Sequence, residues 1–127
     1  MAALTIEATK STPYIHLDDD KHLLAIRGES YPENAAGFYA PVFQWLDGYL
    51  ASASNEIKMN LQIIYFNSSS SKVLLDIFDR LEEVAGRGVP VTINWLYHKE
   101  NDMSLEYGEE FKEEMRQVAF NLIEYSD

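Results

Sequence analysis

The sequence predicts a single α/β domain, residues 1–127, in which a mixed β-sheet carries its helices mainly on one face. Segments with strand-like and helix-like periodicity follow one another in the order β-β-β-α-β-α-β-α-β. Because single helices separate the later strands, we expect those strands to be parallel and joined by right-handed crossovers. Alternating apolar and polar residues in 55–66 indicate that the other sheet face is partly exposed to water.

The residue pattern in the first part of the chain predicts short strands and one helix. Residues 4–8 (LTIEA) and 22–28 (HLLAIRG) alternate like strands, and 14–17 (YIHL) is a candidate third strand, followed by the turn-forming residues DDDK. Residues 30–34 (SYPEN) predict a turn that leads into a helix. We expect Pro41 to bend this helix or delay its regular start, because proline lacks a backbone N–H. The apolar residues at helical spacing are Phe38, Val42, Trp45, Leu46 and Tyr49.

The rest of the chain alternates between strands and helices. The clearest strand is 55–66, followed by a helix over about 70–85, a strand over 89–97, a helix over 104–116 and a strand over 118–125. In the strand 55–66, the side chains expected to face the helices are Ile57, Met59, Leu61, Ile63 and Tyr65.

Composition and charge exclude several classes of function. The net charge of −11 repels phosphate backbones and anionic lipid, so we expect no binding to nucleic acid. The absence of cysteine excludes disulfides and thiol chemistry. The N-terminus lacks the pattern of a signal peptide, and no apolar run approaches the roughly 20 residues that span a bilayer. We therefore expect a cytoplasmic protein with no membrane insertion.

Four consecutive serines, Ser68 to Ser71, lie between the strand 55–66 and the next helix. In α/β sheets, binding and regulatory sites gather at the carboxyl ends of strands, where such loops emerge. Asn67 or one serine is expected to cap the helix by accepting a backbone N–H of its first turn. Capping does not account for the other serines, which have poor helix propensity.

Phosphorylation is a second interpretation of the serine run. The start of a helix presents unpaired N–H groups and about half a positive charge. A phosphate adds about −1.5 to −2 charge and three acceptor oxygens, which the backbone donors, the neighbouring hydroxyls and Lys72 would hold. A third interpretation is a small-molecule or nucleotide-binding sensor that uses the same helix N-terminus as an anion site. The residues alone leave these interpretations open.

The chain resembles the SiaC family of bacterial biofilm-regulating phosphoproteins along essentially its whole length. The resemblance rests on STPYI (11–15), GESYPEN (28–34) and YFNSSSSKVLLDIFDRLEE (65–83), in that order and at those spacings. It implies a STAS-like fold, similar to that of anti-sigma-factor antagonists, with a modified hydroxyl at the start of the helix that follows a central strand.

The same resemblance implies which residue is modified and by what. On this resemblance the expected phosphorylated residue is Ser68, which directly follows Asn67 and stands where the best-known member has threonine; Ser69, Ser70 and Ser71 are alternative acceptors. The family implies that a GHKL-type serine/threonine protein kinase adds the phosphate and that a PP2C-type phosphatase removes it. It also implies that the unmodified form binds and activates a diguanylate cyclase, which would raise cyclic di-GMP and favour biofilm. Because true anti-sigma-factor antagonists usually have Asp where Asn67 stands, a cyclase role is favoured over a sigma-factor role.

Six residues are candidates for partner contacts: Asn67, Ser69, Lys72, Asp76, Glu33 and Asn34. Several have a structural alternative. Asn34 or Ser30 would cap the helix after the SYPEN turn, Asp76 would belong to an exposed acidic face, and Lys72 would be solvated.

The sequence lacks the common motifs of enzymes and metal sites. The chain has no G-x-S-x-G, G-x-G-x-x-G or G-K-[ST] sequence. His16, His22 and His98 have no metal-ligand spacing, and a hairpin turn explains the three adjacent aspartates, 18–20. We therefore expect a non-catalytic protein without a metal or cofactor; an esterase-like enzyme is the remaining alternative.

Overall fold

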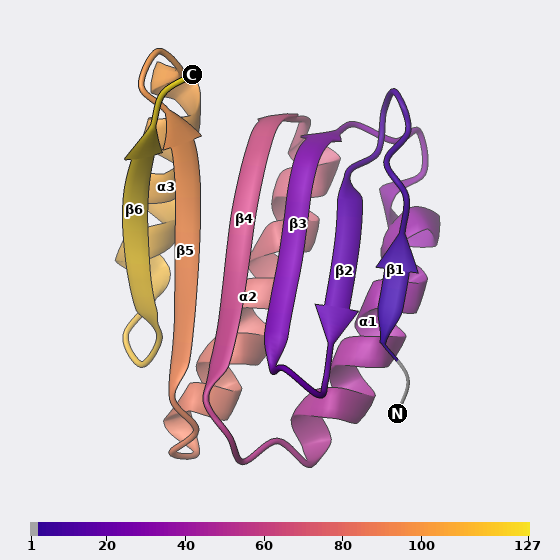
Figure 1. The fold of residues 1–127 in the computed structure, drawn as a ribbon, viewed down its shortest axis with the longest axis vertical. Helices are drawn as coiled ribbons and strands as arrows, with labels where there is room; N and C mark the ends of the chain where they lie inside the picture. The colour runs from indigo at the N-terminus through magenta and orange to yellow at the C-terminus, as the bar shows by residue number, and fades with distance from the viewer. Residues whose placement is uncertain (1–2) are drawn as a thin grey trace.

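The chain forms a six-stranded sheet backed by three helices (Figure 1). The structure is a computed structural model and describes residues 3–127. The strands are β1 (Leu4–Ile6), β2 (Tyr14–Asp18), β3 (Leu23–Ser30), β4 (Ile57–Phe66), β5 (Val91–His98) and β6 (Ala119–Tyr125). The helices are α1 (Ala35–Ala51), α2 (Ser68–Gly86) and α3 (Asp102–Glu114). This order of elements confirms the predicted fold class.

The strands lie in the sheet in their chain order, from β1 to β6. β2 runs antiparallel to both of its neighbours, whereas β3, β4, β5 and β6 are parallel to one another. Each helix therefore connects two adjacent parallel strands. Right-handed crossovers that all step in one direction place their helices on one face, and Figure 1 shows α1, α2 and α3 on the same side of the sheet.

The core lies between the helices and the covered sheet face. The predicted residues Ile57, Met59, Leu61 and Ile63 of β4 are buried there, against buried aromatic side chains of all three helices. Helix α1 begins at Ala35 and continues through Pro41, so the helix start is not delayed.

Polar side chains cover much of the open sheet face. Asn94 Nδ2 donates to Asn60 Oδ1 at 2.9 Å, and Asn121 Nδ2 donates to Asn94 Oδ1 at 3.0 Å. These bonds form a chain of amides across three parallel strands. The open face is therefore partly polar, as the alternation in β4 predicted.

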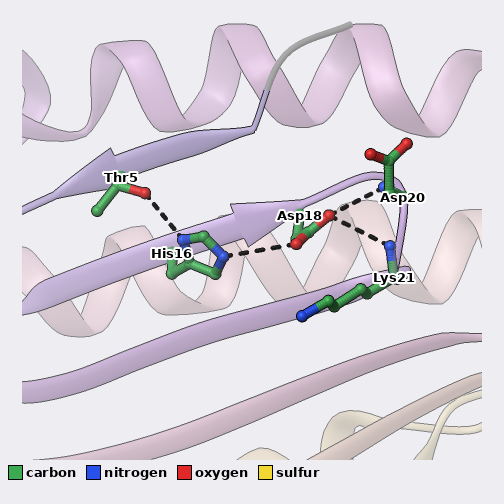
Figure 2. Close-up of polar contacts among 5 residues, drawn as sticks. All are labelled: Thr5, His16, Asp18, Asp20 and Lys21. Carbon is green, nitrogen blue, oxygen red and sulfur yellow. Dashed lines mark hydrogen bonds and ion pairs between the residues drawn. The ribbon is translucent and has the colours of Figure 1, made fainter.

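The hairpin between β2 and β3 is closed by an aspartate (Figure 2). Asp18 Oδ1 accepts the backbone N–H groups of Asp20 at 3.0 Å and Lys21 at 3.2 Å. The bond from the Lys21 N–H is the largest cause that holds the pKa of Asp18 below its usual value. His16 lies between Thr5 Oγ1, 2.8 Å from its Nδ1, and Asp18 Oδ2, 3.6 Å from its Nε2. The DDDK segment is therefore a turn, as predicted.

Two predicted helix starts were wrong by two residues. Helix α2 begins at Ser68 and not near residue 70, and α3 begins at Asp102 and not at 104. In each case an asparagine cap, Asn67 or Asn101, directly precedes the helix. A cap stabilises the first turn by about 1 kcal/mol, which outweighs the low helix propensity of the serines that form the first turn of α2.

A bulge interrupts β4 near its carboxyl end. Gly28 of β3 pairs with Ile63, but the next residue, Glu29, pairs with Tyr65, so that Ile64 is the extra residue. An extra residue reverses the alternation of side chains. Tyr65 is therefore 49% exposed, and the residue after it is buried. The prediction that Tyr65 faces the helices was wrong because strict alternation assumes an uninterrupted strand.

Candidate functional site

The serine run forms the first turn of α2, directly after the carboxyl end of β4. Asn67 is the helix cap: its Oδ1 accepts the backbone N–H of Ser70 at 2.9 Å, and its carbonyl oxygen accepts that of Ser71 at 2.9 Å. The Asn67 N–H donates to the Ser30 carbonyl at 3.1 Å, which ties the start of α2 to the end of β3. Of the two expected kinds of cap, asparagine or serine, the structure therefore has asparagine.

The four serines have different surroundings. Ser68 and Ser69 are exposed, Ser71 is half-buried, and Ser70 is 0% exposed. The reason is geometric, because successive residues of an α-helix point about 100° apart. Ser68 and Ser69 therefore present their hydroxyls to the solution.

Ser70 belongs to a buried chain of hydroxyls. Ser30 Oγ lies 2.7 Å from Ser70 Oγ and 2.7 Å from the Tyr39 hydroxyl. Burial raises the pKa of Tyr39 above its usual value, so this phenol stays neutral at physiological pH. The chain joins β3, α1 and α2 directly behind the exposed serines. Ser30 is therefore not the cap of α1; Asn34 is, and its Oδ1 accepts the Gly37 N–H at 3.0 Å.

The first turn of α2 favours an anion. Among residues 3–127, no group accepts the backbone N–H of Ser68 or Ser69. Lys72 lies one turn later on the helix side that carries Ser68, is exposed, and makes no ion pair with any residue that the structure describes. The unpaired amides, the helix dipole and Lys72 together can stabilise a phosphate on Ser68.

The other predicted partner-binding residues are exposed. Glu33 and Asn34 lie in the loop that follows Ser30. Because the Asn67 N–H donates to the Ser30 carbonyl, this loop and the serines lie at the same edge of the sheet. Asp76 lies about two turns after Ser68 on the same side of α2.

An exposed apolar cluster beside the serines was not predicted. Ile64 is 55% exposed, Tyr65 49% and Met103 61%. The bulge turns Tyr65 outward, Ile64 is the extra residue in it, and Met103 lies in the first turn of α3. Periodicity could not reveal this cluster, because no glycine or proline in 57–66 marks the bulge.

The histidines have partners other than the serines. His22 Nδ1 lies 2.8 Å from the Tyr49 hydroxyl, and His98 Nε2 lies 3.4 Å from Asp127 Oδ2. Within residues 3–127, no three acidic or histidine side chains are arranged to hold a metal ion. In the same part of the chain, no helix has the length and apolar character needed to cross a membrane.

Comparison with known proteins identifies a family and relatives that are similar to this chain. Residues 6–125 match the family model of the SiaC family regulatory phosphoproteins. An uncharacterised protein of Pseudomonas aeruginosa (strain UCBPP-PA14) is 38% identical over 114 residues, which cover 90% of both chains.

Solved structures from Pseudomonas aeruginosa share both sequence and fold with this chain. SiaC is 34% identical with a TM-score of 0.88, covering 100% of both chains, and apo-SiaC is 34% identical with a TM-score of 0.85, covering 98% of both. A structure of the diguanylate cyclase SiaD in complex with its activator SiaC contains a chain 35% identical to this one, with a TM-score of 0.87 over 98% of this chain and 99% of that one. Because sequence and fold agree over nearly the whole length, the chain belongs to the SiaC family of regulatory phosphoproteins.

Proposed function

We propose that the protein is a non-catalytic signalling switch, controlled by reversible phosphorylation of Ser68. The observation that carries the proposal is an exposed serine hydroxyl at the polarised start of α2, in a member of a phosphoprotein family. The partners in this proposal are a GHKL-type serine/threonine kinase and a PP2C-type phosphatase. The kinase consumes ATP, so the proposal places the protein in the cytoplasm, where it acts as one domain.

The proposed target of the unmodified form is a diguanylate cyclase. Support comes from the relative SiaC of Pseudomonas aeruginosa, which is described as the activator of the cyclase SiaD in the complex with it. Activation would raise cyclic di-GMP and promote biofilm formation. In this circuit the protein catalyses no reaction; the phosphorylation state of its surface determines whether it binds the cyclase.

Accessibility favours Ser68 over two of the other three serines. Ser70 is fully buried, and its hydroxyl is bonded to that of Ser30. Ser71 is half-buried, so a kinase reaches it less readily than Ser68. Ser69 is exposed as well, and the family pattern, in which the acceptor directly follows the asparagine, favours Ser68 over it. Ser69 is therefore the matched control for this assignment.

The phosphate would act on binding and leave the fold unchanged. In the free protein it lies in water next to unpaired amides and Lys72, so little rearrangement is needed. In a protein interface the same dianion must lose its water, and Lys72 is the only basic residue in 68–76. Burying a charge without sufficient pairing costs several kcal/mol, so the phosphorylated form should release the cyclase.

Co-expression with the kinase tests the site of modification. Intact mass should show one added phosphate on the wild type and on the control Ser69→Ala, and none on Ser68→Ala. Phosphate on Ser68→Ala would contradict the assignment. If no variant gained phosphate and nucleotides instead raised the melting temperature, the anion-binding sensor would be the better explanation.

Cyclase binding tests the switch itself. We expect Ser68→Ala to bind the purified diguanylate cyclase as the unmodified wild type does, and Ser68→Asp to bind at least about tenfold more weakly, because the carboxylate introduces a charge that must be desolvated. Circular dichroism should show that both variants are folded. Equal affinity of the two variants would refute the switch.

A further inference from the structure

We propose that Ile64, Tyr65 and Met103 form an apolar anchor site, where the cyclase inserts an apolar side chain from a segment flanked by lysine or arginine. The proposal rests on the proposed function, because it assumes that Ser68 controls cyclase binding at this edge of the sheet. We call these three residues the anchor cluster.

The anchor cluster concentrates exposed apolar surface in one place. Four large hydrophobic side chains are exposed among residues 3–127, and three of them are the members of this cluster. All three line the same cavity, of about 110 Å³, between the end of β4 and the start of α3. Contiguous exposed apolar surface with a polar surround is typical of protein interaction sites.

The cavity is shaped to receive one side chain. Phe66 and Tyr107 also line it, with ring centroids 4.6 Å apart. A volume of about 110 Å³ accommodates a single aliphatic side chain. Ser104 lines the same cavity and is 4% exposed, and its hydroxyl has no hydrogen-bond partner among the residues described. Buried hydroxyls are almost always bonded, so a polar atom of the docked segment would complete this site.

Two contacts hold the β4 part of the anchor cluster, the Ile64 backbone and the Tyr65 ring, in position. Asn101 Nδ2 donates to the Ile64 carbonyl at 3.0 Å, while Asn101 Oδ1 caps α3 by accepting the Ser104 N–H at 3.1 Å. The Tyr65 ring lies edge-on to the Tyr31 ring, with centroids 5.6 Å apart. A partner that docks on side chains already held in place loses less conformational entropy than one that must order them.

Charge identifies the chemistry of the partner segment. Glu29 is exposed and pairs with Tyr65, Glu33 is exposed in the loop after β3, and Asp102 and Glu106 are exposed in the first turns of α3. In a chain with a net charge of −11, these carboxylates attract lysine or arginine on either side of the inserted side chain.

The order of the strands relates the anchor cluster to Ser68. Ser68 follows β4, which lies in the sheet between β3 and β5, so Ser68 emerges between the loop that carries Glu33 and the start of α3 at Asp102. A segment that spans from this loop to the start of α3 covers Ser68 and removes its water. The carboxylates at the rim of the interface stay hydrated and attract the partner. A phosphate on Ser68 would instead lie under the docked segment and would have to be desolvated.

Binding of the purified diguanylate cyclase to the unphosphorylated protein tests the anchor cluster. We expect Tyr65→Ala and Met103→Ser each to weaken binding at least about tenfold, as loss of a central anchor does. The control is Ile123→Ala, which truncates the fourth exposed hydrophobic residue, on β6, and should leave binding unchanged. Thermal melts should show all three variants folded. We also expect binding to weaken as salt is raised, because rim charges are screened.

The outcomes separate this proposal from the switch. If Tyr65→Ala and Met103→Ser bind like the wild type while Ser68→Asp binds weakly, the anchor cluster is wrong and the switch stands. If the control loses binding equally, the loss is unspecific and the anchor cluster is wrong. If salt has no effect, the basic flanks are wrong. If the wild type does not bind the cyclase, both proposals fail.

Discussion

At the scale of single residues, burial distinguishes four chemically identical side chains. Ser68 and Ser69 are exposed, whereas the hydroxyl of Ser70 lies inside the protein, bonded to Ser30, which in turn contacts Tyr39. The same run of serines therefore has two roles, because its exposed members offer hydroxyls to solvent while Ser70 joins three elements of the fold. This division explains why one cap does not account for all four residues.

A first stability prediction concerns Ser70. Ser70→Ala removes the hydrogen bond to Ser30 in a fully buried site and should lower the free energy of unfolding by about 1 kcal/mol. The control Ser69→Ala removes an exposed hydroxyl and should change it by less than about 0.5 kcal/mol. Urea denaturation measures both. Equal stability of Ser70→Ala and the control would contradict a structural role for the buried hydroxyl chain.

At the scale of elements, one glycine decides how closely α3 approaches the sheet. A Cβ atom on Gly108 would lie 2.6 Å from Trp95 Cδ1 and 2.8 Å from Leu122 Cδ2. The Trp95 indole is fully buried, and its Nε1 donates to the Ser104 carbonyl at 2.9 Å, which fixes the ring against the first turns of α3. Helix α3 therefore packs on β5 and β6 through a position that tolerates no side chain.

The second stability prediction follows from this contact. Gly108→Ala should destabilise the protein, because overpacking costs about 1–3 kcal/mol and outweighs the gain of up to about 1 kcal/mol in helix propensity. The control is Gly86→Ala in α2, where the new Cβ atom would meet its nearest neighbour, Gln117 Cγ, at an ordinary 3.9 Å. The free energies of unfolding of the two variants can be compared by denaturation monitored through tryptophan fluorescence. A Gly108→Ala variant as stable as the wild type would show that α3 can shift without loss.

At the scale of the whole molecule, a carboxylate connects parts of the chain that are distant in sequence. Both oxygens of Glu82 in α2 accept backbone N–H groups of Arg116, Gln117 and Val118, at 2.8 to 3.0 Å. Partial burial alone would raise the pKa of Glu82, but these hydrogen bonds outweigh it and hold the pKa below its usual value of 4.5. Glu82 thereby fastens the connection between α3 and β6 to the middle helix.

The pH dependence of unfolding tests this connection. Because the pKa of Glu82 is lowered by folding, its contribution is fully present above pH 4.5 and is lost as the pH falls through the folded value. Glu82→Gln should cost about 1 kcal/mol at neutral pH, and the difference from the wild type should shrink in acid. Glu83→Gln, an exposed neighbour, is the control. A difference that does not change with pH would contradict the role of the ionised carboxylate.

Much of the fold could be predicted from the sequence because its signals are local. The periodicity of β4 and of α2 depends on neighbouring residues, and a single helix between two strands is enough to predict parallel pairing and a common helix face. The position of the serine run at the carboxyl end of a strand followed from the same order. The helix starts at Ser68 and Asp102 were missed by two residues, because they depend on which side chain caps the first turn. Asn67 was only one of the expected caps of α2, and the structure shows that Asn67 and Asn101 are the residues that cap these two helices.

By itself, therefore, the sequence determined the order of elements, the covered and open sheet faces, and the place of the serines at a polarised helix start. Only the tertiary structure decided that Ser70 is buried and Ser68 is exposed, because that depends on where β3 and α1 lie around the start of α2. It also decided that Tyr65 points outward, since the bulge arises from pairing with β3 and is held by Asn101, a residue beyond the next strand. Contacts between distant segments have no local periodicity, and for that reason the sequence pattern does not contain them.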